Sequence, residues 1–128
     1  MGILVVVIAT LVCVVDDDES VRESLPDMLE EFGFSAQAFS SPEEFLGSDY
    51  LDQTECLILD VVMPGMSGPD LQRELTLRGQ TIPIVFITAQ ANEALRRRLI
   101  EGGAVECLFK PFSEAAMLAA LRGALGFS

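Results

Sequence analysis

The sequence predicts an α/β domain in which helices cover both faces of a doubly wound, five-stranded parallel sheet. Three observations predict this fold. Short apolar runs rich in β-branched residues alternate with amphipathic segments along the 128 residues, and turn or capping residues separate them. The runs are apolar throughout, as in strands buried on both faces. Hydrophobic residues make up 50% of the chain, enough for one domain to bury a core.

The first strand and helix follow directly from local patterns. Leu11–Val15 is an uninterrupted β-branched run, typical of a buried strand. Ser20-Val21-Arg22-Glu23 matches a capping box, which predicts a helix that starts there and ends near Gly33. Pro26 falls inside this helix, where we expect it to kink the first turns. Phe34–Phe39 alternates partly between apolar and polar residues and is the second predicted strand.

The middle of the chain repeats the alternation. Ser41-Pro42-Glu43-Glu44 provides a cap, a proline at the first helical position and an acid two residues later, so we expect a short helix. Cys56–Leu59 is a compact apolar strand that ends at Asp60. After a turn, Ser67 is placed to cap a helix that runs to about Arg78.

The last two strand–helix pairs complete the fold. Ile82–Ile87 is predicted as a strand, and a helix from about Asn92 ends at Gly102-Gly103, which provides a left-handed C-terminus. Ala104–Phe109 is the fifth strand, and Ser113 caps the final helix. Five such units favour the flavodoxin-like strand order 2-1-3-4-5.

Residues 1–10 are an apolar surplus without an assigned role, and we expect the domain over residues 11–126. The chain carries no charge before Asp16. A secretory signal would need a basic start, and a membrane span needs about 20 apolar residues. Asp16 ends the run too early for either, so we expect no membrane association. An extra strand, a crossing to a partner, a leader and a membrane anchor are the open alternatives.

The composition excludes several classes of function. Eight Lys and Arg against twenty Asp and Glu give a formal charge of −12, which disfavours binding to nucleic acid. The absence of histidine excludes Ser-His and Cys-His catalysis and imidazole metal sites. Cys13, Cys56 and Cys107 each lie in an apolar run, so we expect buried free thiols in a reduced, cytoplasmic protein.

Acidic residues follow two strands that the predicted topology makes neighbours. Asp16 and Asp17 come directly after the first strand, and Asp60 ends the third. In an open parallel sheet, ligands bind beyond the carboxyl ends of the strands where strand order reverses. Carboxylates this close must raise a pKa or bind a cation, and an all-oxygen cluster favours Mg²⁺. The structural alternatives are an acidic helix N-terminus after the first strand and a turn residue at Asp60.

Two further polar residues end the remaining strands of this edge. Thr88 follows the fourth strand, and Lys110, the only lysine of the chain, follows the fifth. Taken singly, each is more often structural. Together with the acids they form a set suited to phosphoryl transfer, in which fixed charges stabilise the moving phosphoryl group.

Five short segments carry a resemblance to a known family: Val14–Glu19, Leu57–Asp60, Met63–Gly68, Phe86–Ala89 and Phe109–Phe112. Across residues 11–125 the chain resembles the receiver domain of two-component response regulators, in the branch of helix-turn-helix transcriptional regulators of nitrogen fixation and nitrate response. Any one segment alone would be weak, but their joint order and spacing are specific.

The resemblance implies a role for each strand-end residue. Asp60 would be the phospho-acceptor, and Asp16, Asp17, Asp60 and the backbone carbonyl of Val62 would bind Mg²⁺. Thr88 and Lys110 would contact the phosphoryl group, with a cis peptide between Lys110 and Pro111. The donor would be a sensor histidine kinase.

The sequence departs from the family pattern at three points. The aromatic residue usually found three residues before the lysine is Cys107 here, and Phe109, nearest the lysine, is expected on the other face of the strand. The resemblance implies that Val62 and its expected neighbour Gln90 face the water that hydrolyses the acyl phosphate, so we expect an unusual phosphoryl lifetime. The chain stops at Ser128, so we expect the DNA-binding output domain to be missing from it.

The fourth predicted helix carries three consecutive arginines, Arg96 to Arg98. A solvated face is one interpretation, with Glu93 placed to pair with Arg97. The other is a contact surface, because the resemblance implies a homodimer through the fourth helix, the fifth strand and the fifth helix.

The sequence therefore predicts a phosphorylated switch domain rather than a turnover enzyme, controlling an output outside this chain. Two alternatives stay open. One is a degenerate receiver that acts as a phosphorylation-independent interaction module, suggested by Cys107 and Val62. The other is a small aspartyl-phosphate phosphatase with its nucleophile at Asp16, although the chain has no room for the usual cap insertion.

Overall fold

The computed structural model describes residues 9–126, which form a five-stranded parallel sheet in the order β2-β1-β3-β4-β5. The predicted fold class and strand order are thereby confirmed. The strands are β1 (Leu11–Val15), β2 (Ser35–Phe39), β3 (Cys56–Asp60), β4 (Ile84–Thr88) and β5 (Glu106–Phe109). The helices are α1 (Glu19–Glu31), α2 (Pro42–Leu46), α3 (Gly68–Leu77), α4 (Glu93–Glu101) and α5 (Glu114–Leu125), with a short 3₁₀ helix at Leu51–Gln53.

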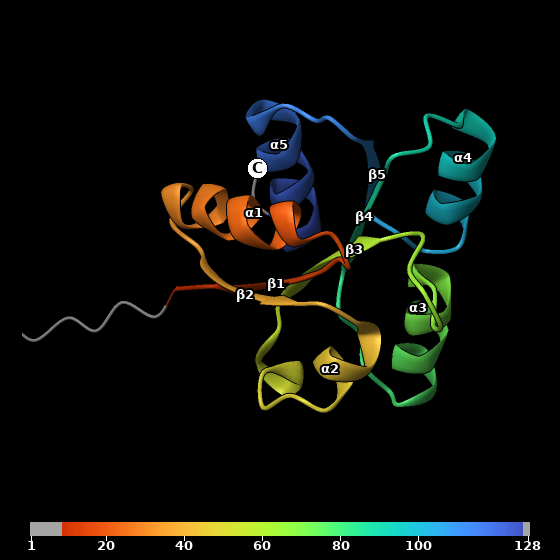
Figure 1. The fold of residues 1–128 in the computed structure, drawn as a ribbon, viewed down its shortest axis with the longest axis horizontal. Helices are drawn as coiled ribbons and strands as arrows, with labels where there is room; N and C mark the ends of the chain where they lie inside the picture. Colours follow the sequence, from red (N-terminus) through yellow and green to blue (C-terminus); the bar gives the residue numbers. More distant parts are fainter. Residues whose placement is uncertain (1–8, 127–128) are drawn as a thin grey trace, which may run out of the picture.

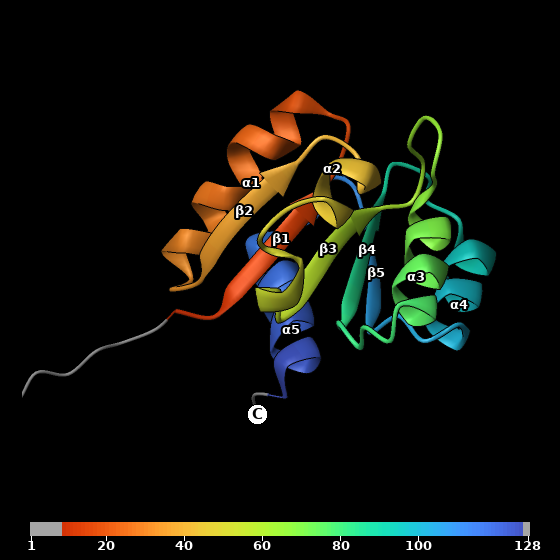
Figure 2. The same cartoon turned by 90° about the horizontal axis from the view of Figure 1, so that it is seen from below.

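The sheet separates two hydrophobic layers. Helices α1 and α5 cover one face, and α2, α3 and α4 cover the other (Figures 1 and 2). Strand β1 shows how one apolar run serves both layers, because successive side chains point to opposite faces. Cys13 and Val15 pack with the α2–α4 layer, whereas Val12 and Val14 pack against α1 and α5.

Most predicted helix starts are confirmed by their caps. The side chains of Ser41, Ser67, Asn92 and Ser113 each accept a hydrogen bond from a backbone N–H in the first turn of the helix that follows. Ser67 also forms a reciprocal capping box with Asp70 at the start of α3.

The capping box predicted at Ser20 is wrong. Helix α1 begins at Glu19, and its cap is Asp18, two residues before Ser20. The Asp18 carboxylate accepts hydrogen bonds from the Ser20 N–H at 2.9 Å and the Ser20 hydroxyl at 2.8 Å. These hydrogen bonds lower the pKa of Asp18. A charged acceptor at a helix N-terminus interacts more strongly than a neutral hydroxyl, which explains why Asp18 replaces Ser20 as the cap.

Strand ends shift slightly from their predicted positions. Strand β4 begins at Ile84 rather than Ile82, because Pro83 has no N–H to donate, although its carbonyl accepts from the Leu57 N–H at 2.9 Å. Strand β5 begins at Glu106 rather than Ala104.

The remaining predictions about chain organisation have mixed outcomes. The three cysteines are buried free thiols, as expected. Of the apolar surplus at residues 1–10, residues 1–8 lie outside the described part. Among residues 9–126, no helix combines the length and hydrophobicity needed to cross a membrane.

Candidate functional site

The candidate site lies beyond the carboxyl ends of β1 and β3, the neighbouring strands at which the strand order reverses. Val15 pairs in register with Leu59, so the residues that follow, Asp16 and Asp60, emerge side by side. Asp16 is completely buried and Asp60 is 7% exposed. Two acids are therefore held close together with little access to solvent.

Lys110 bridges these two carboxylates. Its Nζ donates to Asp16 Oδ2 at 2.9 Å and lies 3.7 Å from Asp60 Oδ1. Burial of the ammonium by itself lowers the pKa of Lys110, but the hydrogen bond to Asp16 and the charge of Asp60 outweigh it, so the pKa is raised. Lys110 is thus held in its charged form at the centre of the cluster.

Asp60 carries the strongest electrostatic perturbation of the site. Burial and the negative charge of Asp16 raise the pKa of Asp60 to about 7, although Lys110 opposes both effects. A raised pKa means that the ionised form of Asp60 is disfavoured until a further positive charge arrives. A cation or a cationic partner would therefore ionise this carboxylate.

Asp17 completes an acidic cluster with the buried pair. One carboxylate oxygen from each of Asp16, Asp17 and Asp60 lies within 4.8 Å of the others, and Asp17 is exposed. Three oxygen donors without nitrogen or sulfur suit a hard divalent cation such as Mg²⁺, which keeps several of its waters. The residues present therefore fit the metal that the sequence predicts.

Thr88 and Lys110 lie together at the adjoining strand ends. The Lys110 N–H donates to the Thr88 carbonyl at 2.8 Å, which continues the pairing of β4 with β5. The buried Thr88 hydroxyl accepts from the Gln90 N–H at 3.1 Å. The Lys110–Pro111 peptide is cis, as the resemblance implied. Val62 follows in the loop after β3 and is 59% exposed.

The loop after β3 returns close to the site at Gly68. The Gly68 N–H donates to the Val61 carbonyl at 3.0 Å, and a Cβ built on Gly68 would lie 2.4 Å from the Asp60 carbonyl. Any larger residue would push the end of β3, and with it Asp60, out of position. Sequence reasoning missed this contact, although the glycine stood in a matched segment.

A second contact missed from the sequence is made by Arg22, on the first turns of α1. Its Nη1 donates to the backbone carbonyl of Asp16 at 3.0 Å. No local pattern predicts this bond, since it depends on how α1 is rotated against β1.

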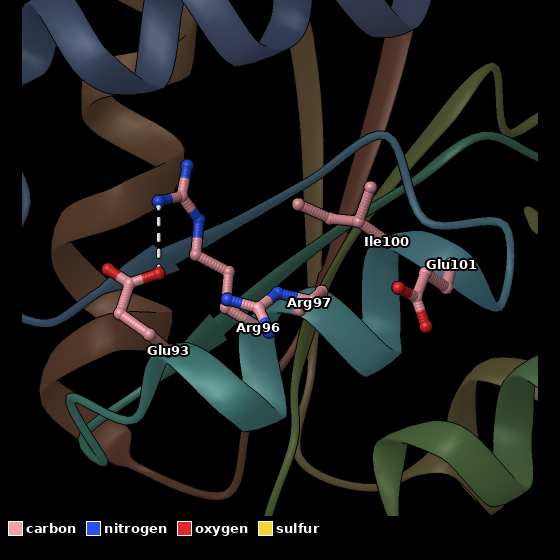
Figure 3. Close-up of a pocket in the computed structure, with 5 residues that line it drawn as sticks. All are labelled: Glu93, Arg96, Arg97, Ile100 and Glu101. Carbon is pink, nitrogen blue, oxygen red and sulfur yellow. Dashed lines mark ion pairs between the residues drawn. The ribbon is translucent and has the colours of Figure 1, made fainter.

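Two predictions beside the site are wrong. Phe109 lies on the same face of β5 as Cys107, because residues two apart on a strand share a face, and both pack in the layer of α2 to α4. Glu93 pairs with Arg96, at 3.6 Å, and not with Arg97 (Figure 3). Arg96 points toward β5 because two residues of that strand contact it. Its Nη2 lies 2.9 Å from Glu106 Oε1, and its Cζ lies 6.0 Å from the centroid of the Phe109 ring.

Comparisons with known proteins agree with this geometry. The response regulator receiver domain family matches residues 12–122. Response regulator protein TodT of Pseudomonas putida is 41% identical over 117 residues, covering 91% of this chain and 52% of the relative. Transcriptional regulatory protein FixJ of Azorhizobium caulinodans is 38% identical over 115 residues, covering 90% of this chain and 54% of FixJ.

Solved structures give the same result. The response regulator StyR superposes with a TM-score of 0.83 at 44% identity, covering 93% of this chain and 60% of that one. The N-terminal part of FixJ gives 0.82 at 32% identity, covering 94% and 96%. This chain thus spans about half the length of the curated relatives it matches. By its sequence, its strand order and its strand-end residues, the chain belongs to the response regulator receiver domain family.

Proposed function

We propose that this receiver domain accepts a phosphoryl group on Asp60 from the phosphohistidine of a sensor histidine kinase. Members of the family are phospho-acceptor switch domains that such kinases phosphorylate. The observation that carries the assignment to Asp60 is its place beside the buried Asp16, with Lys110 between the two carboxylates and a pKa raised to about 7. The 128 residues contain no histidine, so the donor histidine lies outside this sequence.

In the proposed reaction, an Asp60 carboxylate oxygen attacks phosphorus, the phosphorus–nitrogen bond of the donor breaks, and the imidazole leaves with the bonding electrons. Lys110 stabilises the oxygens of the transferred group and pairs with the acyl phosphate once it forms. The Thr88 hydroxyl donates to a phosphoryl oxygen after it rotates away from its bond with Gln90. The only later reaction is hydrolysis of the acyl phosphate, which returns Asp60 to a carboxylate, so the domain acts as a switch.

Mg²⁺ is the proposed cofactor, held by Asp16, Asp17, Asp60 and the backbone carbonyl of Val62. When bound, it neutralises charge on the transferring phosphoryl group. The cluster of three carboxylate oxygens supports this proposal, because it contains no nitrogen or sulfur ligand. Ionisation of Asp60 near neutral pH follows from the added positive charge.

Phosphorylation of Asp60 is proposed to bias the surface formed by α4, β5 and α5, and thereby a transcriptional output domain and homodimer formation. Thr88 and Lys110 are the proposed link, because Thr88 ends β4, the strand before α4, and Lys110 directly follows β5. We propose a cytoplasmic location, which is consistent with membership of the response regulator family. We also propose that the chain itself does not bind nucleic acid, given its charge of −12.

A phosphorylation-independent interaction module is the second candidate, and the buried Cys107 at the usual aromatic position favours it. The phosphatase alternative is weaker, because it needs Asp16 as nucleophile. Both Asp16 carboxylate oxygens already accept hydrogen bonds, from the Asp18 N–H and from Lys110, and the side chain is completely buried.

Intact-mass measurement after incubation with acetyl phosphate and Mg²⁺ tests the proposal. We expect the wild type to gain the mass of one phosphoryl group and Asp60→Asn to gain none. Labelling of Asp60→Asn would move the nucleophile elsewhere, Asp16 included. Absence of labelling in the wild type, together with unchanged amide chemical shifts of α4 on addition of beryllofluoride and Mg²⁺, would favour the interaction module.

A further inference from the structure

Arg22 reaches from α1 to the backbone that carries the acidic cluster. Its Nη1 donates to the Asp16 carbonyl at 3.0 Å, and its own N–H donates to the Asp18 carbonyl at 3.1 Å. The side chain is half-buried. A single residue of α1 thereby contacts the main chain on both sides of Asp17.

Asp16, the residue before Asp17, forms a hydrogen bond through each of its backbone and side-chain polar groups. The Asp16 N–H donates to the Phe39 carbonyl at 3.1 Å, and its carboxylate accepts from the Asp18 N–H and from Lys110, both at 2.9 Å. The Arg22 guanidinium takes the remaining group, the carbonyl. That carbonyl belongs to the peptide that joins Asp16 to Asp17, so its direction sets where the Asp17 side chain starts.

Asp17 differs from its neighbour in burial. It is exposed, while Asp16 and Asp60 are buried, yet its carboxylate oxygen lies within 4.8 Å of theirs. An exposed side chain keeps such a position only if its backbone is oriented for it. The hydrogen bonds around the Asp16–Asp17 peptide supply that orientation. Arg22, on α1, contributes the hydrogen bond to the Asp16 carbonyl.

We infer that Arg22 is a positioning residue, which fixes the Asp16–Asp17 peptide so that Asp17 can join Asp16 and Asp60 around a divalent cation. The inference rests on the Mg²⁺ site of the proposed function. Groups that orient metal ligands from outside the first coordination sphere commonly affect metal affinity about tenfold or more.

A purely electrostatic role for Arg22 predicts the opposite sign. The guanidinium is a positive charge beside a site for a cation, so its removal would strengthen cation binding if charge alone mattered. Loss of orientation would weaken binding. The direction of the change therefore separates the two roles.

The test compares Mg²⁺ affinity of the full chain, by calorimetric titration, in wild type, Arg22→Met and Arg22→Lys. The control is Arg98→Met, which removes the same charge from the exposed face of α4. We expect Arg22→Met to bind Mg²⁺ about tenfold more weakly, with Arg22→Lys between it and wild type and Arg98→Met unchanged. The amide signal of Asp17 should shift in Arg22→Met before any metal is added.

Unchanged or tighter Mg²⁺ binding by Arg22→Met would overturn the inference. If that variant fails to fold, judged by its urea unfolding curve, Arg22→Lys carries the test by the same criterion. Failure of the wild type to bind Mg²⁺ would instead contradict the proposed function, so the two failures are distinguishable.

Discussion

Two clusters in this domain place one cation between two carboxylates, and they differ mainly in burial. Lys110 lies between Asp16 and Asp60, whose side chains are 0% and 10% exposed. Arg96 lies between Glu93 and Glu106, whose side chains are 69% and 30% exposed. Each cluster has more acids than cations, but water screens the second and not the first.

The difference in burial shows which of the two charged clusters can be reactive. In the exposed cluster, Arg96 holds α4 to β5 through two hydrogen bonds to Glu106 Oε1, which also accepts from the Cys107 N–H. This cluster anchors a helix whose only buried residue is Leu99. In the buried cluster, the unbalanced acid raises the pKa of Asp60 to about 7 and creates a need for another cation. We interpret the Arg96 cluster as a structural clamp and the Lys110 cluster as a reactive site.

Lys110→Ala should have the largest effect on stability. It leaves two buried carboxylates without their cation, and removal of one partner from a buried ion pair typically costs about 3–5 kcal/mol. Protonation of Asp60 offsets part of this, so we expect the free energy of unfolding to fall by about 2–4 kcal/mol at neutral pH in urea. Lys110→Arg keeps the charge and should lose less. Equal losses for the two variants would show that packing, not charge, is what Lys110 supplies.

Lys110→Ala should also show whether phosphorylation and the dimerisation that follows it depend on different residues. Asp60 keeps its oxygens, so acyl-phosphate labelling is expected to persist, while dimerisation after labelling is expected to weaken. Sedimentation of labelled wild type and variant measures this. Equal dimerisation of the two would contradict the role given to Lys110.

Asp60→Asn should stabilise the metal-free protein in a pH-dependent way. The folded-state pKa of Asp60 is raised to about 7, above the unfolded value of about 3.9, so ionisation destabilises the fold. The penalty is absent below the unfolded pKa, grows as pH rises, and is complete above about pH 7. We expect Asp60→Asn to exceed wild type by about 1–3 kcal/mol at pH 8 and to match it near pH 4, in urea unfolding without divalent cations. A constant difference across this range would contradict the electrostatic origin.

Arg96→Met should have the smallest effect. Exposed ion pairs contribute about 0.2–1 kcal/mol, and the contact with the Phe109 ring adds little at an exposed site, so we expect a loss near 1 kcal/mol. High salt should shrink this loss but leave most of the Lys110→Ala effect. Arg97→Met, on the same helix but outside the clamp, is the control and should be close to neutral.

The clusters also show what a sequence can predict. Asp16, Asp17, Asp60, Thr88 and Lys110 were placed at one edge because parallel strands all end there, so strand assignment and order suffice. The Arg96–Glu106 pair joins two elements, and helical spacing favoured an exposed i,i+4 pair instead. The contact of Arg22 with the Asp16 carbonyl depends on how α1 is rotated against β1. The contact of Gly68 with the Asp60 carbonyl depends on the path of the loop after β3. No local sequence pattern encodes either. The start of α1 depends on competition between two candidate caps, Asp18 and Ser20, which lie two residues apart.

The most direct test of the contrast between the clusters is the effect of Mg²⁺ on the free energy of unfolding at pH 8. A ligand that binds only the folded state raises the free energy of unfolding by RT ln(1 + c/Kd), where c is the free ligand concentration, so tighter binding stabilises more. We expect Mg²⁺ to stabilise wild type and Arg96→Met equally, and to stabilise Asp60→Asn much less, because only the buried cluster holds the cation. Equal stabilisation of all three proteins, or none in wild type, would contradict the account.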